Sequence, residues 1–375
     1  MDWSAWRDEF PILGRKTYLN TCSLTPLGKA HRAATERFFA QWDELGASAW
    51  YGPWTDAIDE LRGKVAKLLH APKEEIALAP NVSSALGTLM SCLPLQQQSV
   101  VASDMDFPTL TYHFMAKPHL DVRFVKGDGV EVPLQAYVRA MDPSVAVLAF
   151  SQVWYQSGGI APAQELTKLA RQQGALALCD GYQGAGHLPT DPRAMGCDVY
   201  ITGGLKWLLG GTGIAFAWVR RELHEQMKPR VTGWFANARQ FDFDSTRFSF
   251  HTDARRFEAG TPSLHAVHMA SAGLDIVLRI GESALRDRTR ALDTDLVDRL
   301  QDHSFQLKTP EAPDRRGGIV AVAWDREDPS KAVQRLAQEN IIVDARPGRV
   351  RLSPYFYNTE EDNERAVQAL VKARG

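Results

Sequence analysis

The sequence lacks the features that mark membrane-spanning, secreted and zinc-binding proteins. No run approaches the roughly 18 unbroken apolar residues of a membrane span. The first 14 residues, MDWSAWRDEFPILG, carry acidic residues early and contain no apolar signal core, so we expect no secretion signal. The cysteines are scattered, with no C-x-x-C pair and no histidine at ligand spacing. This pattern argues against structural zinc and predicts a reduced, cytoplasmic setting. The four are Cys22, Cys92, Cys179 and Cys197.

An excess of positive charge is also missing. The 43 Lys and Arg residues nearly balance the 45 Asp and Glu residues, and no basic run occurs. A nucleic-acid or anionic-membrane partner therefore has little support. The apolar fraction of 44% and the charged fraction of 23% are ordinary for a globular protein. We find no internal repeat, and a chain of 375 residues exceeds the usual single-core limit, so we expect two domains.

Apolar strands alternate with helical segments through the first two thirds of the chain. This alternation predicts an α/β fold with a mainly parallel, helix-covered sheet. The expected strands are 76–80, 99–104, 122–127, 145–153, 175–180, 199–202 and 213–219. From about His265 the composition shifts to long helices with two apolar runs, which predicts a smaller α+β domain. We expect a large domain over 15–264 and a small domain formed by 1–14 and 265–375.

The stretch 175–219 places an acid and a lysine at the ends of apolar strands. Asp180 follows ALALC, and Lys206 lies 26 residues later in the turn GGLKWLLGG. Both residue types are poor occupants of apolar strand ends unless they have partners. Pyridoxal phosphate is a cofactor that needs both groups.

Further polar and aromatic residues follow other strands. Ligands of parallel sheets bind beyond the carboxyl ends of the strands, so these residues should converge on one pocket. Taken singly, each has a plainer role: a helix cap, a core aromatic, a loop residue, a metal ligand or a lysine reaching solvent. Taken together, they favour a binding site. They are Ser83, Phe107, Tyr155, Asp180, Gln183 and Lys206.

These motifs resemble class V aminotransferases, a branch of the fold-type I pyridoxal-phosphate enzymes that includes cysteine desulfurases, isopenicillin N epimerase and kynureninase. The core of the resemblance is D-G-Y-Q-G-A-G-H (180–187), then C-D (197–198), then L-K-W-L-x-G-G-T-G (205–213). It extends from YLNTCSLTPLG (18–28) to RVRLSPYFYNTEED (349–362). The segments FPT (107–109), GWF (233–235) and RFEAGTPS (256–263) look closest to the kynureninase and epimerase side.

The resemblance implies a role for each core residue. Lys206 would form the internal aldimine and then move the Cα proton of the substrate. Asp180 would keep the pyridine nitrogen protonated, through a charge-assisted hydrogen bond of about 1.5–3 kcal/mol. Gln183 would approach the phenolic oxygen of the cofactor. Phe107 would stack on its ring, and Tyr155 is similar to a residue on the kynureninase side.

Residues outside the core are implied in binding phosphate and substrate. Ser83, Ser84 and the neighbouring backbone N–H groups would hold the phosphate at a helix N-terminus, and Trp234 would add an indole donor. Thr261 matches a residue that reaches the phosphate of the neighbouring subunit, which implies a homodimer with shared active sites. Arg351 would bind the α-carboxylate of an amino-acid substrate, assisted by Asn20. Of the nearby Arg346 and Arg349, we expect one or both to face solvent.

The sequence departs from the family pattern before the lysine. Many members have S-x-H-K, whereas this chain has Gly203-Gly204-Leu205-Lys206, so a phosphate-binding hydroxyl and a polar neighbour are missing. No cysteine lies in the C-terminal region where a desulfurase carries its nucleophile, which disfavours that activity.

Four functions stay open. An aminotransferase is ahead as the broader description. Next comes a lyase or hydrolase that cleaves at Cβ, with an epimerase behind it. A non-catalytic binding protein is the weakest, because the pair of Asp180 and Lys206 would then have no chemical purpose. Dinucleotide binding is disfavoured, because the glycines fit neither G-x-G-x-x-G nor G-x-x-x-x-G-K-[ST].

Overall fold

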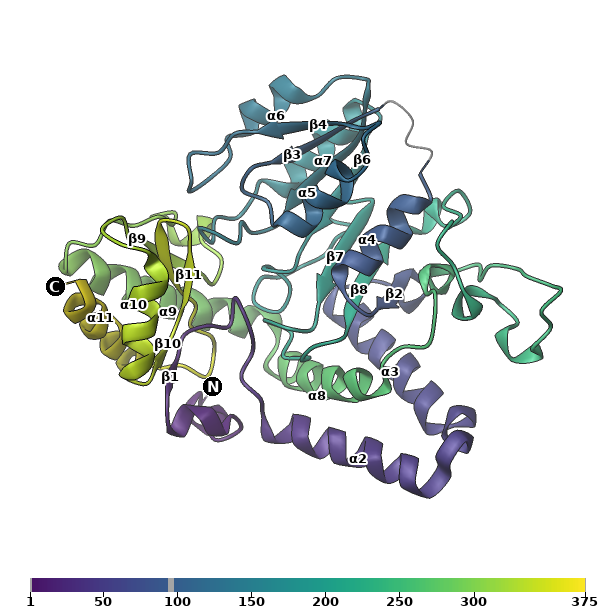
Figure 1. The fold of residues 1–375 in the computed structure, drawn as a ribbon, viewed down its shortest axis with the longest axis horizontal. Coiled ribbons are helices and arrows are strands. Elements are labelled where there is room, and N and C mark those ends of the chain that lie inside the picture. Colours follow the sequence, from purple (N-terminus) through teal and green to yellow (C-terminus); the bar gives the residue numbers. More distant parts are fainter. Residues whose placement is uncertain (1, 94–97, 375) are drawn as a thin grey trace.

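A seven-stranded sheet organises the larger part of the molecule (Figure 1). The computed structural model describes residues 2–93 and 98–374. Neighbouring strands pair in parallel, except that β8 is antiparallel to both β7 and β2. This arrangement confirms the predicted α/β class with a mainly parallel sheet. The order is β2 (Ile76–Ala79), β8 (Ala215–Val219), β7 (Val199–Gly203), β6 (Leu176–Asp180), β5 (Val145–Ser151), β3 (Ser99–Ser103) and β4 (Asp121–Val125).

Apart from the edge strand β4, both faces of this sheet are buried, because side chains alternate between two hydrophobic layers. In β6, Ala177 and Cys179 belong to one hydrophobic cluster and Leu178 belongs to the other. The first layer holds side chains of α3 (Pro53–Leu68), α6 (Leu134–Ala140), α7 (Ala163–Gln172) and α8 (Leu264–Ile280). The second holds α4 (Val82–Ser91) and α5 (Pro108–Met115). Among the residues described, no helix has the length and apolar character needed to cross a membrane.

The C-terminal part has its own sheet and its own hydrophobic cluster. Strands β9 (Val320–Ala323), β12 (Arg349–Leu352) and β11 (Asp344–Arg346) form an antiparallel sheet. Helices α9 (Glu282–Asp302), α10 (Pro329–Gln338) and α11 (Glu360–Arg374) contribute to the cluster. Helix α8 packs against α3 and α2 (Lys29–Leu45) of the larger part. The division into domains 15–264 and 1–14 plus 265–375 stays a prediction.

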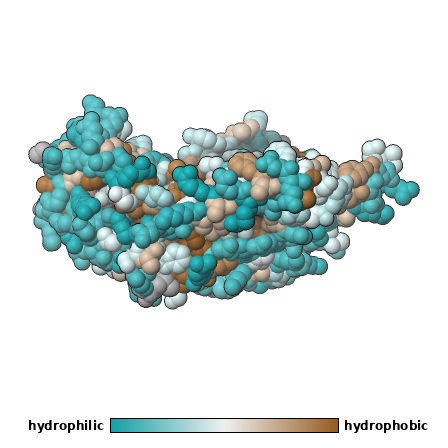
Figure 2. All heavy atoms as spheres, turned by 90° about the horizontal axis from the view of Figure 1, so that it is seen from below, coloured by the Kyte–Doolittle hydropathy of each residue, from teal (hydrophilic) through white to brown (hydrophobic). Residues whose placement is uncertain are grey.

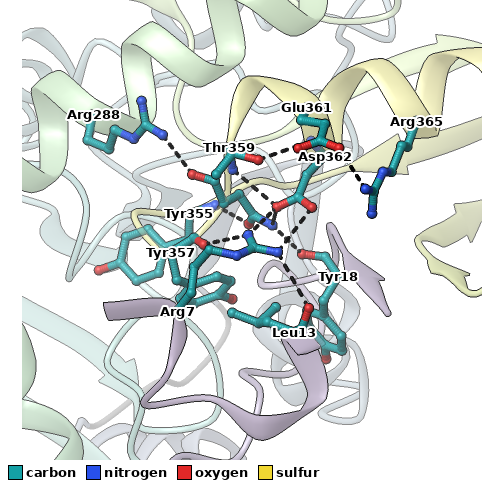
Figure 3. Close-up of polar contacts among 11 residues, drawn as sticks. Arg7, Leu13, Tyr18, Arg288, Tyr355, Tyr357, Thr359, Glu361, Asp362 and Arg365 are labelled. Carbon is teal, nitrogen blue, oxygen red and sulfur yellow. Dashed lines mark hydrogen bonds and ion pairs between the residues drawn. The ribbon is translucent and has the colours of Figure 1, made fainter. Parts of the chain in front are cut away.

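The N-terminal segment lies against this C-terminal part (Figure 3). Helix α1 is only Ser4–Arg7, followed by a 3-10 turn at Pro11–Gly14. The guanidinium of Arg7 pairs with the buried carboxylate of Asp362 at 2.6 Å and donates to the Tyr357 carbonyl at 3.0 Å. Strand β1 (Thr17–Tyr18) pairs in parallel with β10 (Ile341–Ile342). Two residues after β1, Asn20 forms an isolated parallel β-bridge with Ser353.

An extended segment between β8 and α8 projects from the body at the right of Figure 1. It carries exposed aromatic side chains, and the 3-10 turn after α2 (Gly46–Tyr51) adds another. Figure 2 shows hydrophobic atoms on the projecting end and along the underside of the molecule. Exposed aromatic side chains that gather on one surface commonly mark a binding face. The most exposed of these aromatics are Tyr51, Phe241, Phe243 and Phe248, and Trp42 on α2 is exposed as well.

Candidate active site

One cavity of about 210 Å³ lies at the carboxyl ends of β5 and β6, beside the turn that follows β7 and the N-terminus of α4. All six residues that the sequence placed at strand ends line it, so the predicted convergence is confirmed. Their individual roles stay predictions. The lining comprises Asn81, Val82, Ser83, Phe107, Thr109, Ser151, Val153, Tyr155, Asp180, Tyr182, Gln183, Leu205 and Lys206.

Lys206 presents its amine to this cavity without a polar partner. Among the described residues its Nζ atom forms neither a hydrogen bond nor an ion pair. It lies 4.7 Å from the ring centre of Tyr182 and 5.6 Å from that of Phe107. Burial lowers the pKa of this amine, and the opposing effects of Cys22 and Asp180 are smaller. A lowered pKa increases the neutral, nucleophilic fraction of a lysine.

Asp180 ends β6 with one carboxylate oxygen in use. Its Oδ1 atom accepts the backbone N–H of Tyr182 at 2.9 Å, and no described residue donates to its Oδ2 atom. The side chain is buried, and burial raises its pKa to about 6, against the smaller effects of the Tyr182 amide and Lys206. A buried carboxylate with a spare oxygen is suited to a cationic donor from a ligand.

Gln183 is held by both ends of its amide. Nε2 donates to the Cys22 carbonyl at 2.9 Å, and Oε1 accepts the indole N–H of Trp207 at 2.8 Å. A primary amide has two hydrogens on nitrogen, so one remains for a ligand in the cavity. These contacts fix the direction in which that hydrogen points.

Two aromatic rings form a wall of the cavity. Phe107 precedes α5 and is 38% exposed, which leaves a ring face free for stacking. Tyr155 meets it edge to face, with ring centres 5.2 Å apart. The carboxylate of Asp106, the residue before Phe107, holds the backbone next to this wall. It accepts the backbone N–H groups of Ser103 and Ser151, each at 2.8 Å, and so ties the loop before Phe107 to β5.

The N-terminus of α4 provides donors beside the cavity. Asn81 caps the helix by accepting the Ser84 N–H at 2.8 Å, so that N–H is already used. Ser83 lines the Lys206 cavity, whereas Ser84 lines a separate cavity of about 340 Å³. The structure therefore brings Ser83, and not Ser84, into the lining of the Lys206 cavity.

Trp234 and Thr261 do not line the Lys206 cavity. The indole N–H of Trp234 donates to Thr261 Oγ1 at 3.3 Å, and the Trp234 ring stacks on Phe243 of the projecting segment. Thr261 shares the lining of the separate cavity with Ser84. Both residues lie on exposed surface. A role at the phosphate of a neighbouring subunit stays a prediction.

Arg351 is fully buried next to the Tyr155 backbone. Its guanidinium pairs with Asp344 and donates to the Tyr155 carbonyl, while its Nε atom has no partner among the described residues. It does not line the cavity directly, although it lies 5.9 Å from the Tyr155 ring centre. Asn20 is held by its bridge to Ser353, two residues beyond Arg351, and it too lies outside the cavity lining.

Of Arg346 and Arg349, one or both of which we expected to face solvent, Arg349 does not and Arg346 does so only in part. Arg349 is 9% exposed, and its guanidinium donates to the Gly129 carbonyl at 2.8 Å. Arg346 is half-buried and pairs with Asp344 at 2.9 Å. The register of β11 with β12 sets Asp344 opposite Arg351 and Arg346 opposite Arg349. Because alternate residues of a strand share a face, one acid and three arginines gather on one side of this hairpin.

Sequence reasoning assigned no role to two residues at this site. Tyr182 lines the cavity between Asp180 and Lys206, and Asp106 supports Phe107. The signal for Tyr182 was its place inside the motif D-G-Y-Q. No pattern in the sequence pointed to Asp106.

The chain belongs to the class V aminotransferases, since the family described as Aminotransferase class-V matches residues 29–365. This class consists of pyridoxal-phosphate enzymes, and the chain is an enzyme of this class. It is 31% identical to an uncharacterised aminotransferase, YcbU, of Bacillus subtilis, over 98% of this chain and 96% of that protein. It is 26% identical to a kynureninase of Geobacillus thermodenitrificans, over 98% and 90% of the two chains.

Solved structures share the fold. A cysteine desulfurase from Thermococcus onnurineus superposes with a TM-score of 0.88 at 21% identity, over 98% of this chain and 97% of that one. A lysine-to-alanine mutant of C-DES, with glycine covalently linked to the PLP cofactor, gives 0.90 at 19% identity, over 97% and 98%. These similarities confirm the fold-type I architecture predicted from the motifs.

The residues present fit pyridoxal phosphate. The cavity offers an unpaired amine on Lys206, a carboxylate oxygen of Asp180 without a donor among the described residues, and a spare amide hydrogen on Gln183. These are the groups needed to hold the aldehyde carbon, the ring nitrogen and the phenolic oxygen of that cofactor. A helix N-terminus completes the set with donors for an anion.

Proposed function

We propose that this enzyme transfers the amino group of an amino acid, using Lys206 to move the Cα proton. The observation that carries the proposal is the half-buried amine of Lys206, which has no polar partner among the described residues and a lowered pKa, in the same cavity as Asp180. Bound pyridoxal phosphate would supply the electron sink that accepts the electron pair left at Cα. Asp180 would keep the ring nitrogen protonated, and the neutral amine of Lys206 would take up the proton and return it to a neighbouring carbon.

The hairpin of β11 and β12 supports an anionic substrate. Arg351, Arg346 and Arg349 outnumber the one carboxylate of Asp344 on its inner face. Since Arg351 is already paired with Asp344, a substrate carboxylate would exchange with Asp344 or use the Nε–H of Arg351, which has no acceptor within the described part of the chain. A planar guanidinium meets a carboxylate through two parallel hydrogen bonds.

Cleavage at Cβ is the second candidate, and the similarity to kynureninase favours it. Both reactions begin with loss of the Cα proton to Lys206. Asp180 and Lys206 would therefore have the same roles in transamination and in cleavage at Cβ. Desulfurase chemistry is disfavoured, because no cysteine of the described residues lines the cavity. Cys22, Cys179 and Cys197 are buried, and all four cysteines are free thiols, in keeping with a reduced, cytoplasmic location.

A screen of amino acids against the purified, cofactor-loaded enzyme tests the proposal. Transamination converts the bound cofactor to its amine form in a single turnover and releases a keto acid. It then requires a second keto acid to restore the starting spectrum. Release of pyruvate, alanine or a sulfur compound, with the cofactor spectrum restored without an added keto acid, would instead establish the lyase or hydrolase.

We further propose that two copies of the chain associate through the projecting segment. Phe243 is 69% exposed and Tyr51 is 78% exposed, which is costly for an isolated chain in water. Trp234 and Thr261 lie at the base of this surface and do not line the Lys206 cavity of their own chain. This position is expected if they serve the active site of a neighbouring subunit. Sedimentation should give a dimer, and Phe243→Ser should shift the protein toward monomers. A monomeric wild-type protein at micromolar concentration would refute the shared site.

A further inference from the structure

The ring of Tyr182 occupies the space that a side chain at residue 203 would need. A Cβ atom placed on Gly203 would lie 2.7 Å from each of three Tyr182 atoms: Cε2, Cζ and the hydroxyl oxygen. Such contacts are shorter than real Cβ atoms make, so a serine at this position and the observed Tyr182 exclude one another. Gly203 does not have a positive φ, so its backbone conformation does not require glycine. The close approach of the tyrosine accounts for the glycine.

Tyr182 lies beside both Asp180 and Lys206. Its backbone N–H donates to Asp180 at 2.9 Å, and its ring lies 4.7 Å from the Lys206 amine. The side chain lines the cavity together with Asn81, Val82 and Ser83 at the N-terminus of α4. The Tyr182 hydroxyl oxygen would lie 2.7 Å from a Cβ atom on residue 203, so it occupies the space in which the family pattern places a serine side chain.

The chemistry of the phenol suits an anion. Burial raises the pKa of Tyr182 to about 12, against the smaller effect of the Leu205 backbone amide. The hydroxyl thus stays protonated near neutral pH and remains a hydrogen-bond donor. Leu205, where relatives place a histidine, brings no polar side chain, so the turn itself offers no other side-chain donor before Lys206.

We propose that the Tyr182 hydroxyl replaces the missing hydroxyl of residue 203 and donates a hydrogen bond to the phosphate of bound pyridoxal phosphate. The inference rests on the assignment of that phosphate to the N-terminus of α4, and it does not depend on which reaction follows. Gly203 and Tyr182 are then linked changes relative to the family pattern. The hydroxyl is carried by Tyr182, in the loop after β6, and not by residue 203 at the end of β7. Residue 203 is a glycine because a larger side chain would collide with the tyrosine.

Cofactor affinity measured with two forms of the cofactor tests the proposal. Pyridoxal lacks the phosphate but keeps the aldehyde and the ring. For Tyr182→Phe, the dissociation constant of pyridoxal phosphate should rise about 10- to 100-fold, as expected for a lost hydrogen bond to a charged group. The constant for pyridoxal should not change. Tyr112→Phe, on the exposed face of α5, removes a phenol hydroxyl away from the cavity and should leave both constants unchanged.

A second pair of variants uses the steric exclusion. Gly203→Ser should weaken binding of pyridoxal phosphate in the wild-type background, because the new side chain collides with Tyr182. In the Tyr182→Ala background the same serine should improve binding, because the space is then open and the serine supplies a hydroxyl. The effect of Gly203→Ser on cofactor affinity should therefore change sign between the two backgrounds. This change is expected only if the side chains of residues 182 and 203 compete for the same space.

Three outcomes separate the possibilities. Equal loss of affinity for both cofactor forms in Tyr182→Phe would overturn the proposal, because the hydroxyl would then act on the ring or on the fold. Unchanged affinity for both would overturn it as well. A wild-type protein that binds no pyridoxal phosphate would contradict the assignment of the cavity to this cofactor, which is a different failure.

Discussion

Asp106 and Asp180 are two buried aspartates close to the same edge of the sheet, and they have opposite hydrogen-bonding states. They are 5% and 6% exposed, and burial raises the pKa of each. Asp106 accepts three hydrogen bonds, from the backbone N–H and hydroxyl of Ser103 and the N–H of Ser151. Asp180 accepts one, from Tyr182. Burial alone thus does not distinguish a structural acid from one that binds a ligand; the unused oxygen does.

The energetic reason is the cost of an unsatisfied buried charge. A carboxylate removed from water is destabilised unless hydrogen bonds or an opposite charge replace the lost hydration. The protein supplies these for Asp106 from two strand ends. For Asp180 it supplies one amide and the Lys206 amine, which is not in contact with it, so a bound ligand with a cationic nitrogen completes the set. The contrast predicts different losses when each carboxylate is changed.

The largest effect should come from removing the amine that shares the cavity with Asp180. Lys206→Ala should abolish turnover and the yellow colour of the purified protein, because no other amine of the described residues lines the cavity. Absorbance spectra of the wild-type and variant proteins after incubation with pyridoxal phosphate measure this directly. A wild-type protein that stays colourless, or a variant that keeps the wild-type band, would contradict the assignment.

Asp180→Asn should be the next most damaging change for activity. The amide cannot hold a proton on the ring nitrogen through an ion pair, and loss of a buried charge partner is worth about 3–5 kcal/mol. That range corresponds to a fall in kcat of roughly two to four orders of magnitude. Steady-state rates at saturating cofactor provide the measurement.

Asp106→Asn is the matched control for this change. It should lower the free energy of unfolding by about 1–3 kcal/mol, because one of its acceptor oxygens becomes a donor facing other donors. Its kcat should fall far less than that of Asp180→Asn. Equal losses of kcat in the two variants would break the distinction between them.

How far the sequence predicts this site can be seen from these same residues. The motif D-G-Y-Q and the lysine 26 residues later identified Asp180, Gln183 and Lys206, because apolar strands set their positions. Asp106 escaped prediction because its partners lie 3 and 45 residues away, a relation that only the folded sheet creates. The exchange between Tyr182 and Gly203 likewise needs two loops in contact. The antiparallel β8 was hidden as well, since an apolar strand looks the same in either direction.

Arg351 offers a third buried charge with which to sharpen the contrast. Like Asp106 it has protein partners, but like Asp180 it keeps one polar atom free of partners among the described residues. Arg351→Ala should raise KM for the amino acid by more than about 30-fold, the equivalent of 2 kcal/mol or more, with little change in cofactor retention. Arg349→Ala, whose guanidinium donates to backbone carbonyls, should raise KM less. An unchanged KM for Arg351→Ala would assign that arginine a purely structural role.

The smallest effect should appear in the pH dependence of stability. Because burial raises the folded-state pKa of Asp180 to about 6 from 3.8, the folded cofactor-free protein binds more protons than the unfolded chain between these values. This contribution to the free energy of unfolding is therefore full below pH 3.8 and is lost as pH rises through about 6.

Cofactor loading should remove the Asp180 contribution, since a cationic ring nitrogen stabilises the ionised form. It should leave that of Asp106 unchanged, because Asp106 does not line the cavity and both of its oxygens already accept hydrogen bonds. Denaturant titrations of wild type, Asp180→Asn and Asp106→Asn between about pH 4 and 7, with and without cofactor, separate the two. If cofactor loading instead removed the pH-dependent contributions of Asp106 and Asp180 equally, the two carboxylates would respond to the cofactor together. That result would mean that an unused oxygen does not distinguish a ligand-binding aspartate from a structural one.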